Sequence, residues 1–305
     1  MRSKALQALA TEGINPASRN LDSKSALEIA RIINREDAKV ALAVRRALPQ
    51  IAHAIDDVAN ALAKGGRLIY VGTGTSGRIG ALDASESAPT FGVPARQVQY
   101  IMAGGPKALG KAIEASEDSV QLGRAEIARR RPTRDDVVIG IAASGRTPFT
   151  LSAVRYARAH GARTVAVTCN RNSPLERAAN YAIVTEVGPE VLSGSSRMKA
   201  GTAEKLVLNM ISTGSMARLG YVYDNLMVHV RLKNSKLIER GTTIVVTSTG
   251  LDRNAARKLL RTAGNDVAIA IIMKKANVSR TEATRALKEA NGNVRKAIAW
   301  AQTRA

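Results

Sequence analysis

Short, continuous apolar runs alternate along the middle of the chain with segments whose apolar residues recur every three or four positions. The runs lie at 68–71, 98–102, 137–141, 164–168 and 182–185, and the clearest helical spacing lies at 120–129 and 149–160. Continuous runs of this length are typical of strands buried on both faces. Their alternation with helices predicts an α/β fold, a five-stranded parallel sheet with helices on each side.

Helical spacing without intervening strands fills both ends of the chain. Two or three amphipathic helices are predicted over 25–37, 38–48 and 50–64, and residues 11–18, with Gly13 and Pro16, predict an extended arm. Further helices are predicted at 198–219, 224–230, 235–239, 252–262, 267–274, 279–290 and 294–301. We therefore predict an N-terminal arm and helices over 1–64, the sheet domain over 65–250 and a small helical domain over 251–305.

Three of the predicted strands run into loops rich in glycine and hydroxyl side chains, at 72–77, 142–147 and 193–197. Each loop is followed by a segment that can form a helix, and after the third loop this helix is long. Free backbone N–H groups and the positive end of the helix dipole favour an anion at such a junction. Open α/β sheets bind ligands at the carboxyl ends of their strands, so the sequence predicts an anionic ligand at this edge.

Composition limits the class of protein. The 305 residues, 45% of them hydrophobic, suffice for one large core and a small appendage, and no apolar run approaches the length of a membrane span. The segment from Met1 to Ala5 lacks the features of a secretory signal. The single cysteine, Cys169, ends an apolar run and is interpreted as a buried thiol. We therefore expect a cytoplasmic protein without membrane association.

The net charge of +21 is typical of proteins that bind nucleic acid or another anionic partner. Aromatic residues make up only 3% of the chain, so stacking surfaces for single strands are scarce, and no helix-turn-helix, finger or RNP motif stands out. Specific nucleic-acid binding is therefore not expected despite the charge. It stays an alternative, which a steep salt dependence of DNA retention would support.

Several catalytic motifs can be excluded. Gly72, Gly74 and Gly77 match the dinucleotide fingerprint, but the strand ending at Met102 is not followed by the acidic residue that would bind a ribose. No Walker lysine or Gly-x-Ser-x-Gly elbow is present. The three histidines are far apart in the sequence and lack ligand partners, so no metal is expected: His53, His160 and His229.

Two acidic clusters follow predicted strands, Asp83 with Glu86, and Glu114 with Glu117 and Asp118. Carboxyl groups near a bound sugar phosphate can act as acid and base when their environments separate their pKa values. Alternatively, these residues are ordinary acids at helix N-termini, where the dipole favours them.

The order and spacing of several motifs resemble the N-acetylmuramic acid 6-phosphate etherase family, which is built on the sugar isomerase (SIS) domain. The motifs are Thr11-Glu12-Gly13, Gly66-Arg67-Leu68-Ile69-Tyr70, Gly74-Thr75-Ser76-Gly77-Arg78, Leu82-Asp83-Ala84-Ser85-Glu86, Glu117-Asp118-Ser119, Gly140-Ile141-Ala142-Ala143-Ser144-Gly145-Arg146-Thr147-Pro148 and Gly194-Ser195-Ser196-Arg197-Met198-Lys199-Ala200-Gly201-Thr202-Ala203. The C-terminal part resembles the small helical, UBA/CUE-like domain that follows the SIS domain in this family.

The resemblance implies a carbon–oxygen lyase that cleaves the D-lactyl ether of N-acetylmuramic acid 6-phosphate, giving N-acetylglucosamine 6-phosphate and D-lactate in peptidoglycan recycling. It implies that Glu117 is the base at C2 and that Glu86 is the acid that protonates the lactate oxygen. It further implies a homodimer with the site near the subunit interface, and neither a metal nor an organic cofactor.

The wider SIS pattern implies a phosphate cradle and residues that line the sugar. The residues are Thr75, Ser76, Gly77, Ser144, Gly145, Arg146 and Thr147 in the first two loops, and Ser195, Ser196 and Lys199 beside the third. For Arg146, pairing with a surface acid is an open alternative, and Lys199 can be a charge on a helix face.

The sequence departs from the family in two ways. Glu86-Ser87-Ala88-Pro89 stands where family members commonly read Glu-Cys-Pro-Pro, which alters the loop but keeps the carboxylate. The chain is also more basic than the family generally is. A phosphosugar-sensing regulator without catalysis stays an alternative function, since related SIS proteins bind phosphosugars without converting them.

Overall fold

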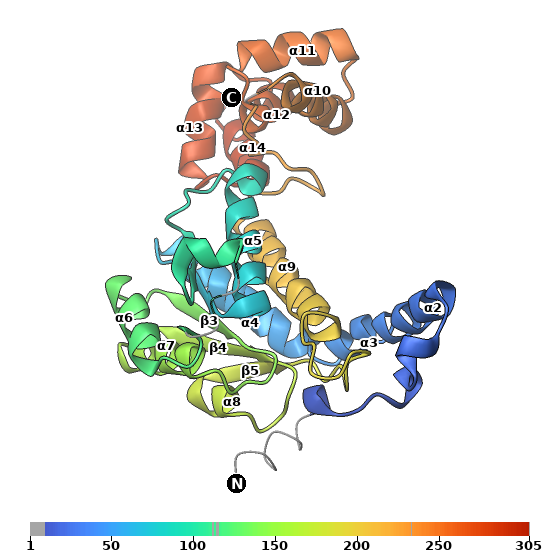
Figure 1. Ribbon diagram of the computed structural model, residues 1–305. Helices are drawn as coiled ribbons and strands as arrows, with labels where there is room; N and C mark the ends of the chain where they lie inside the picture. Colours follow the sequence, from blue (N-terminus) through green and yellow to red (C-terminus); the bar gives the residue numbers. More distant parts are fainter. Residues whose placement is uncertain (1–9, 112, 114–115, 233, 305) are drawn as a thin grey trace. The chain divides into compact units, whose positions relative to one another are not determined.

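Five parallel strands form one sheet, in the order β2-β1-β3-β4-β5. The computed structural model (Figure 1) describes residues 10–111, 113, 116–232 and 234–304. The strands are β1 (Leu68–Gly72), β2 (Val98–Met102), β3 (Val137–Ile141), β4 (Arg163–Thr168) and β5 (Tyr181–Val184). The predicted α/β fold with a five-stranded parallel sheet is confirmed.

Helices cover both faces of the sheet. The helices of this part of the chain are α2 (Ala26–Asp37), α3 (Val40–Arg45), α4 (Leu48–Ala63), α5 (Gly74–Phe91), α6 (Val120–Arg129), α7 (Pro148–Ala159), α8 (Pro174–Ala178) and α9 (Lys199–Leu219), with a 3-10 turn at Gly105–Leu109. Ile69, Val71 and Val138 pack with Ile127 and Phe149 of α6 and α7. On the other face, α4 contacts β1, β3 and β5 (Figure 1). Every residue of β1 and β3 is buried as a result, which explains their continuous apolar runs.

The buried Tyr70 of β1 ties the sheet to α5 and α9. Its hydroxyl donates to Oδ2 of Asp83 at 2.7 Å, and Asn209 and Ser212 donate to Oδ1 at 2.8 and 3.0 Å. Because all these groups are at least partly buried, each hydrogen bond satisfies an atom that water reaches poorly. The network holds the first turns of α5 at the carboxyl edge of the sheet.

The prediction of an extended arm is wrong. The segment forms 3-10 turns at Ala10–Glu12, Pro16–Ser18 and Leu21–Ser23. Asn15 Oδ1 accepts from the N–H of Ala17 and its Nδ2 donates to Glu36 Oε2 at 2.9 Å, so a local Asx turn replaces extended backbone.

The chain folds as two compact units: Met1–Ser85 with Arg96–Ser212, and Glu86–Ala95 with Thr213–Ala305. The domain ranges given by the sequence stay a prediction. The second unit contains α10 (Ser235–Thr249), α11 (Arg253–Thr262), α12 (Val267–Ala276), α13 (Arg280–Glu289) and α14 (Val294–Gln302). Five residues from Ala268 to Ile272 of α12 are buried at its centre. Asp252, Asp266, Ser279 and Asn293 cap the starts of α11 to α14.

Two helical predictions within the second unit differ from the structure. Residues 224–230 form turns instead of a helix, with Asp224 at a φ of +57° and a bridge between Tyr223 and Leu226. The helix predicted at 235–239 is only the first part of α10, which ends where Gly250 adopts a φ of +74°. A left-handed residue of this kind is a common helix end.

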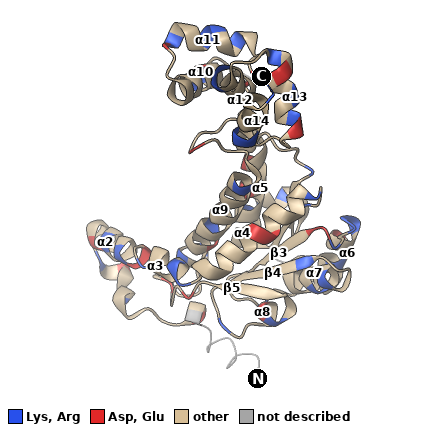
Figure 2. Cartoon of the chain, turned by 180° about the vertical axis from the view of Figure 1, so that it is seen from behind, with Lys and Arg blue, Asp and Glu red and all other residues tan. Residues whose placement is uncertain are grey.

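Lysine and arginine are distributed over helices of both units (Figure 2). In the part of the chain that the structure describes, no helix combines the length and apolar character needed to cross a membrane.

Candidate functional site

The β1–α5 loop is built by close backbone packing. Helix α5 begins at Gly74, whose φ is +51°, just after β1 ends at Gly72. A Cβ on Gly77 would lie 2.8 Å from the carbonyl oxygen of Gly72, so only glycine permits this approach. The N–H groups of a first helical turn have no intrahelical partners, so those around Thr75 and Ser76 can bind an anion.

The β3–α7 loop is equally constrained. Gly145 has a φ of +64°, and a Cβ there would lie 2.4 Å from Cβ of Ser173. Ser144 Oγ accepts from the N–H of Arg146 at 3.2 Å, and Thr147 precedes α7 without capping it through its side chain. The predicted phosphate residues of this loop therefore lie together at the N-terminus of α7.

Glu117 lies between these two loops. Its backbone carbonyl accepts from the N–H of Phe149 in α7 at 3.1 Å. Its side chain reaches the other loop, where Oε1 lies 3.1 Å from the position that a Cβ on Gly74 would take. The structure thus brings the predicted base to the predicted phosphate cradle, whereas Glu114 lies outside the described residues.

The third predicted loop meets the first at the start of α9. The N–H of Gly201 donates to the carbonyl of Ser196 at 2.9 Å. A Cβ on Gly201 would lie 3.3 Å from Cγ2 of Thr75 and 3.6 Å from that same Ser196 oxygen. Thr75 and the turn of Ser195 and Ser196 are therefore neighbours.

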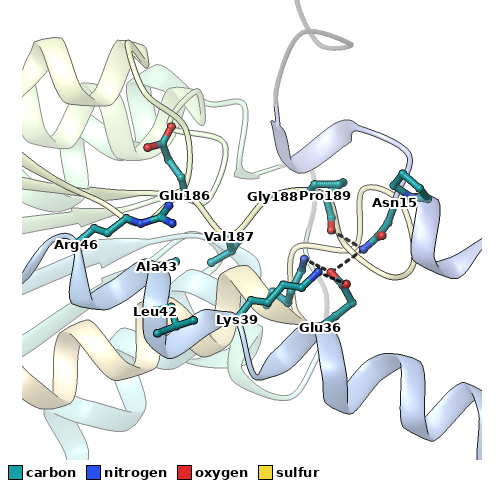
Figure 3. Close-up of a pocket in the computed structure, with 12 residues that line it drawn as sticks. Asn15, Glu36, Lys39, Leu42, Ala43, Arg46, Glu186, Val187, Gly188 and Pro189 are labelled. Atoms are coloured by element: carbon teal, nitrogen blue, oxygen red, sulfur yellow. Dashed lines mark hydrogen bonds and ion pairs between the residues drawn. The ribbon is translucent and has the colours of Figure 1, made fainter.

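Lys199 is placed away from this cluster, beside a cavity of about 420 Å³ lined by α2, α3 and residues 186–189 (Figure 3). Its buried ammonium donates to Glu36 Oε2 at 2.9 Å, and Lys39 and Asn15 also donate to that carboxylate. Burial favours the neutral acid, but these hydrogen bonds lower the pKa of Glu36 to about 2. A contact between Lys199 and the sugar stays a prediction.

Glu86 is exposed on α5, one turn after the buried Asp83. It begins the stretch of α5 that belongs to the second unit, whereas Glu117 belongs to the first. The pairing of the two glutamates therefore stays a prediction. Among the described residues, no group of three or more His, Cys, Asp and Glu side chains is arranged to hold a metal ion.

One residue at this edge was not predicted. Ser76 Oγ donates to Oε1 of Glu204 in α9 at 2.9 Å, and both side chains are buried. Burial raises the pKa of Glu204 to about 8, against the opposing effect of the Ser76 hydrogen bond. In the sequence, Glu204 is only an acidic residue within a predicted helix whose apolar residues recur every three or four positions. Its position gives no indication of a contact with Ser76.

Three models of known families match parts of the chain. The N-terminal SIS domain of glucokinase regulatory protein matches residues 50–158, the SIS domain family matches 129–214, and the UBA domain of HYPK matches 268–299. A solved phosphoheptose isomerase from Francisella tularensis shares the fold, with a TM-score of 0.50, 20% identity, and coverage of 64% of this chain and all of that one.

Relatives of known name match almost the whole chain. An N-acetylmuramic acid 6-phosphate etherase from Pectobacterium atrosepticum is 52% identical, covering 96% of this chain and 97% of its own length. One from Aeromonas hydrophila is 50% identical, covering 94% of this chain and 96% of its own length. The chain therefore belongs to the N-acetylmuramic acid 6-phosphate etherase family, whose core is an SIS domain.

Proposed function

We propose that this protein cleaves the D-lactyl ether of N-acetylmuramic acid 6-phosphate, giving N-acetylglucosamine 6-phosphate and D-lactate. The observation that carries the proposal is the 52% identity, over 96% of the chain, to a relative with this etherase name. The alternative of a non-catalytic regulator is not favoured, because the matched relatives are etherases and both glutamates are present.

The substrate's phosphate binds at the first two loops. The first turn of α5 and the loop ahead of α7 supply backbone N–H groups, with hydroxyls from Thr75, Ser76, Ser144 and Thr147. A phosphate at paired helix N-termini gains both hydrogen bonds and the favourable dipole ends. Ser195 and Ser196, next to Thr75, contact the sugar.

Elimination requires one base and one acid. Once the sugar ring opens, the aldehyde makes the C2 proton acidic, and Glu117 removes it. The C3–O bond breaks as Glu86 protonates the departing lactate oxygen, since an ether oxygen is a poor leaving group unless it is protonated. The product is an α,β-unsaturated aldehyde, and water then adds at C3. The enzyme is thus a carbon–oxygen lyase in which two carboxyl groups carry the proton transfers.

The protein acts in the cytoplasm, in the recycling of peptidoglycan amino sugars, as a homodimer. Large apolar side chains exposed on the N-terminal helices support association: Leu27, Leu42 and Leu48 are 59, 57 and 44% exposed. Light scattering coupled to gel filtration should give twice the mass of one chain; a monomer at all concentrations would contradict the dimer.

Glu117→Gln tests the assignment of the base. The amide cannot accept the C2 proton, so exchange of solvent deuterium into C2 should be lost while the variant still binds the phosphosugar. NMR of the sugar in D₂O measures the exchange, and Asp118→Asn, an exposed neighbour, is the matched control that should keep it. Full exchange in Glu117→Gln would remove Glu117 as the base.

A further inference from the structure

Glu204 is buried in the protein interior, and one of its two carboxyl oxygens has no hydrogen-bond partner among the described residues. Its exposed fraction is 0%. Oε1 is hydrogen-bonded to Ser76 at 2.9 Å, whereas Oε2 has no hydrogen-bond partner among the residues that the structure describes. A buried carboxylate needs several donors to be stable, so this surrounding favours the neutral acid.

Within the part of the chain that the structure describes, only burial and the Ser76 hydrogen bond act appreciably on the pKa of Glu204, so no nearby charge compensates its ionisation. The Cys169 thiol, after β4, has its pKa raised by burial and then by the negative charges of Glu204 and Glu190. Glu190 itself accepts from the N–H groups of Lys199 and Ala200 at the start of α9. On α9, the Lys199 ammonium pairs with Glu36, and the charge of Lys205 acts on Asp83.

The protonation state of Glu204 decides what the Ser76 hydroxyl can do. A carboxylate can only accept, so Ser76 must then give it its single proton. A neutral carboxyl can donate through Oε1 to Ser76 Oγ across the same 2.9 Å, which leaves the Ser76 proton free for another acceptor. A carboxylate would also put negative charge directly behind the proposed phosphate cradle.

We propose that Glu204 is a positioning residue for the phosphate: in its neutral form it turns the Ser76 hydroxyl toward the ligand, and its ionisation withdraws that donor. This inference rests on the proposed function, because it takes the first turn of α5 as part of the phosphate cradle.

Ligand affinity should therefore fall as pH rises. The pKa of about 8 for Glu204 means that the neutral form is lost in the alkaline range. If only this form binds well, the apparent Kd should rise about tenfold from about pH 7 to about pH 9. The second ionisation of a phosphate monoester lies near pH 6, so the ligand is a dianion throughout this range.

Calorimetric titration of N-acetylglucosamine 6-phosphate over this pH range tests the inference in the full-length protein. Glu204→Gln keeps a neutral donor toward Ser76 at every pH, so the variant should still bind the ligand at about pH 7 and its Kd should stay nearly constant to about pH 9. Glu126→Gln, a surface acid on α6, is the matched control and should retain the tenfold rise.

Ser76→Ala provides a second readout that does not depend on folding of the Glu204 variant. It should bind more weakly at neutral pH and show a smaller alkaline rise in Kd than the unmodified protein, because the hydroxyl that Glu204 orients is gone. A Kd that rises equally in Glu204→Gln, Ser76→Ala and the unmodified protein would overturn the inference while leaving the proposed function in place. Absence of any phosphosugar binding at neutral pH would contradict the proposed function, and this inference with it.

Discussion

Replacing the single residue Ser144 tests the proposed phosphate cradle. Its hydroxyl accepts from the loop's own backbone and keeps its proton for a ligand. Hydrogen bonds to charged groups contribute about 1.5–3 kcal/mol, so Ser144→Ala should weaken binding of N-acetylglucosamine 6-phosphate by at least about tenfold. Calorimetry with the phosphorylated and the unphosphorylated sugar measures the difference.

The matched control for this change is Ser152→Ala on α7, whose hydroxyl donates to the carbonyl of Phe149 and should not affect either ligand. Equal losses for the two sugars in Ser144→Ala would contradict a role in binding phosphate.

The contacts of some site residues could be predicted from the sequence, and those of others could not. Glu117 stands in a motif, and the fold then brings it to Gly74 through its backbone tie to Phe149. The contact between Ser76 and Glu204 joins positions that are 128 residues apart, and no local pattern encodes such a pair. The hydrogen bond between Lys199 and Glu36 was not predictable either, because the two residues are far apart in the sequence.

At the scale of elements, the strands were predictable because each is a short apolar run, and β1 and β3 are buried at every residue. The helix predicted at 224–230 is wrong for a different reason. Val228 and Val230 are apolar because they are buried in the core of the second unit, although the backbone there forms turns. Their apolar character therefore comes from tertiary packing and not from one face of a helix. The five-residue helix α8 was missed because it is too short to show a period.

The amino ends of β1 and β3 are fixed by one ion pair. Asp136 Oδ1 accepts from the N–H and Nε of Arg67 at 2.9 Å, and its Oδ2 accepts from Nη2 at 2.6 Å. Burial opposes the charge of Asp136, but the hydrogen bonds from Arg67 and Thr133 outweigh it and lower its pKa. An acid with a lowered pKa in the folded state stabilises the fold above its unfolded pKa, and this stabilisation is lost as pH falls.

Asp136→Asn should therefore lower the free energy of unfolding by about 2–4 kcal/mol at neutral pH, because it leaves Arg67 without its charged partner. The deficit relative to the unmodified protein should shrink as pH falls below about 4, the pKa of an aspartate in the unfolded chain, and vanish below the lowered pKa of Asp136 in the folded protein. Urea unfolding followed by circular dichroism measures the free energy of unfolding at neutral pH and below about pH 4. Asp135→Asn, at an exposed neighbouring residue, is the control. A deficit of equal size at neutral and at acidic pH would contradict the role of the charge.

For the whole molecule, the net charge of +21 is the property that the proposed reaction does not require. Because the substrate carries a phosphate and a carboxylate, a positive surface should accelerate its encounter with the enzyme. We expect kcat/KM to fall severalfold between about 20 and about 200 mM salt as the field is screened. Steady-state kinetics should show kcat almost unchanged; a kcat/KM independent of salt would exclude steering.

The most direct test of the account is to incubate the protein with N-acetylmuramic acid 6-phosphate in H₂¹⁸O and analyse both products by mass spectrometry. Elimination and water addition predict free D-lactate that keeps the original ether oxygen, together with N-acetylglucosamine 6-phosphate labelled at the C3 hydroxyl. Failure to release lactate, or label in the lactate instead of at C3, would contradict the proposed reaction.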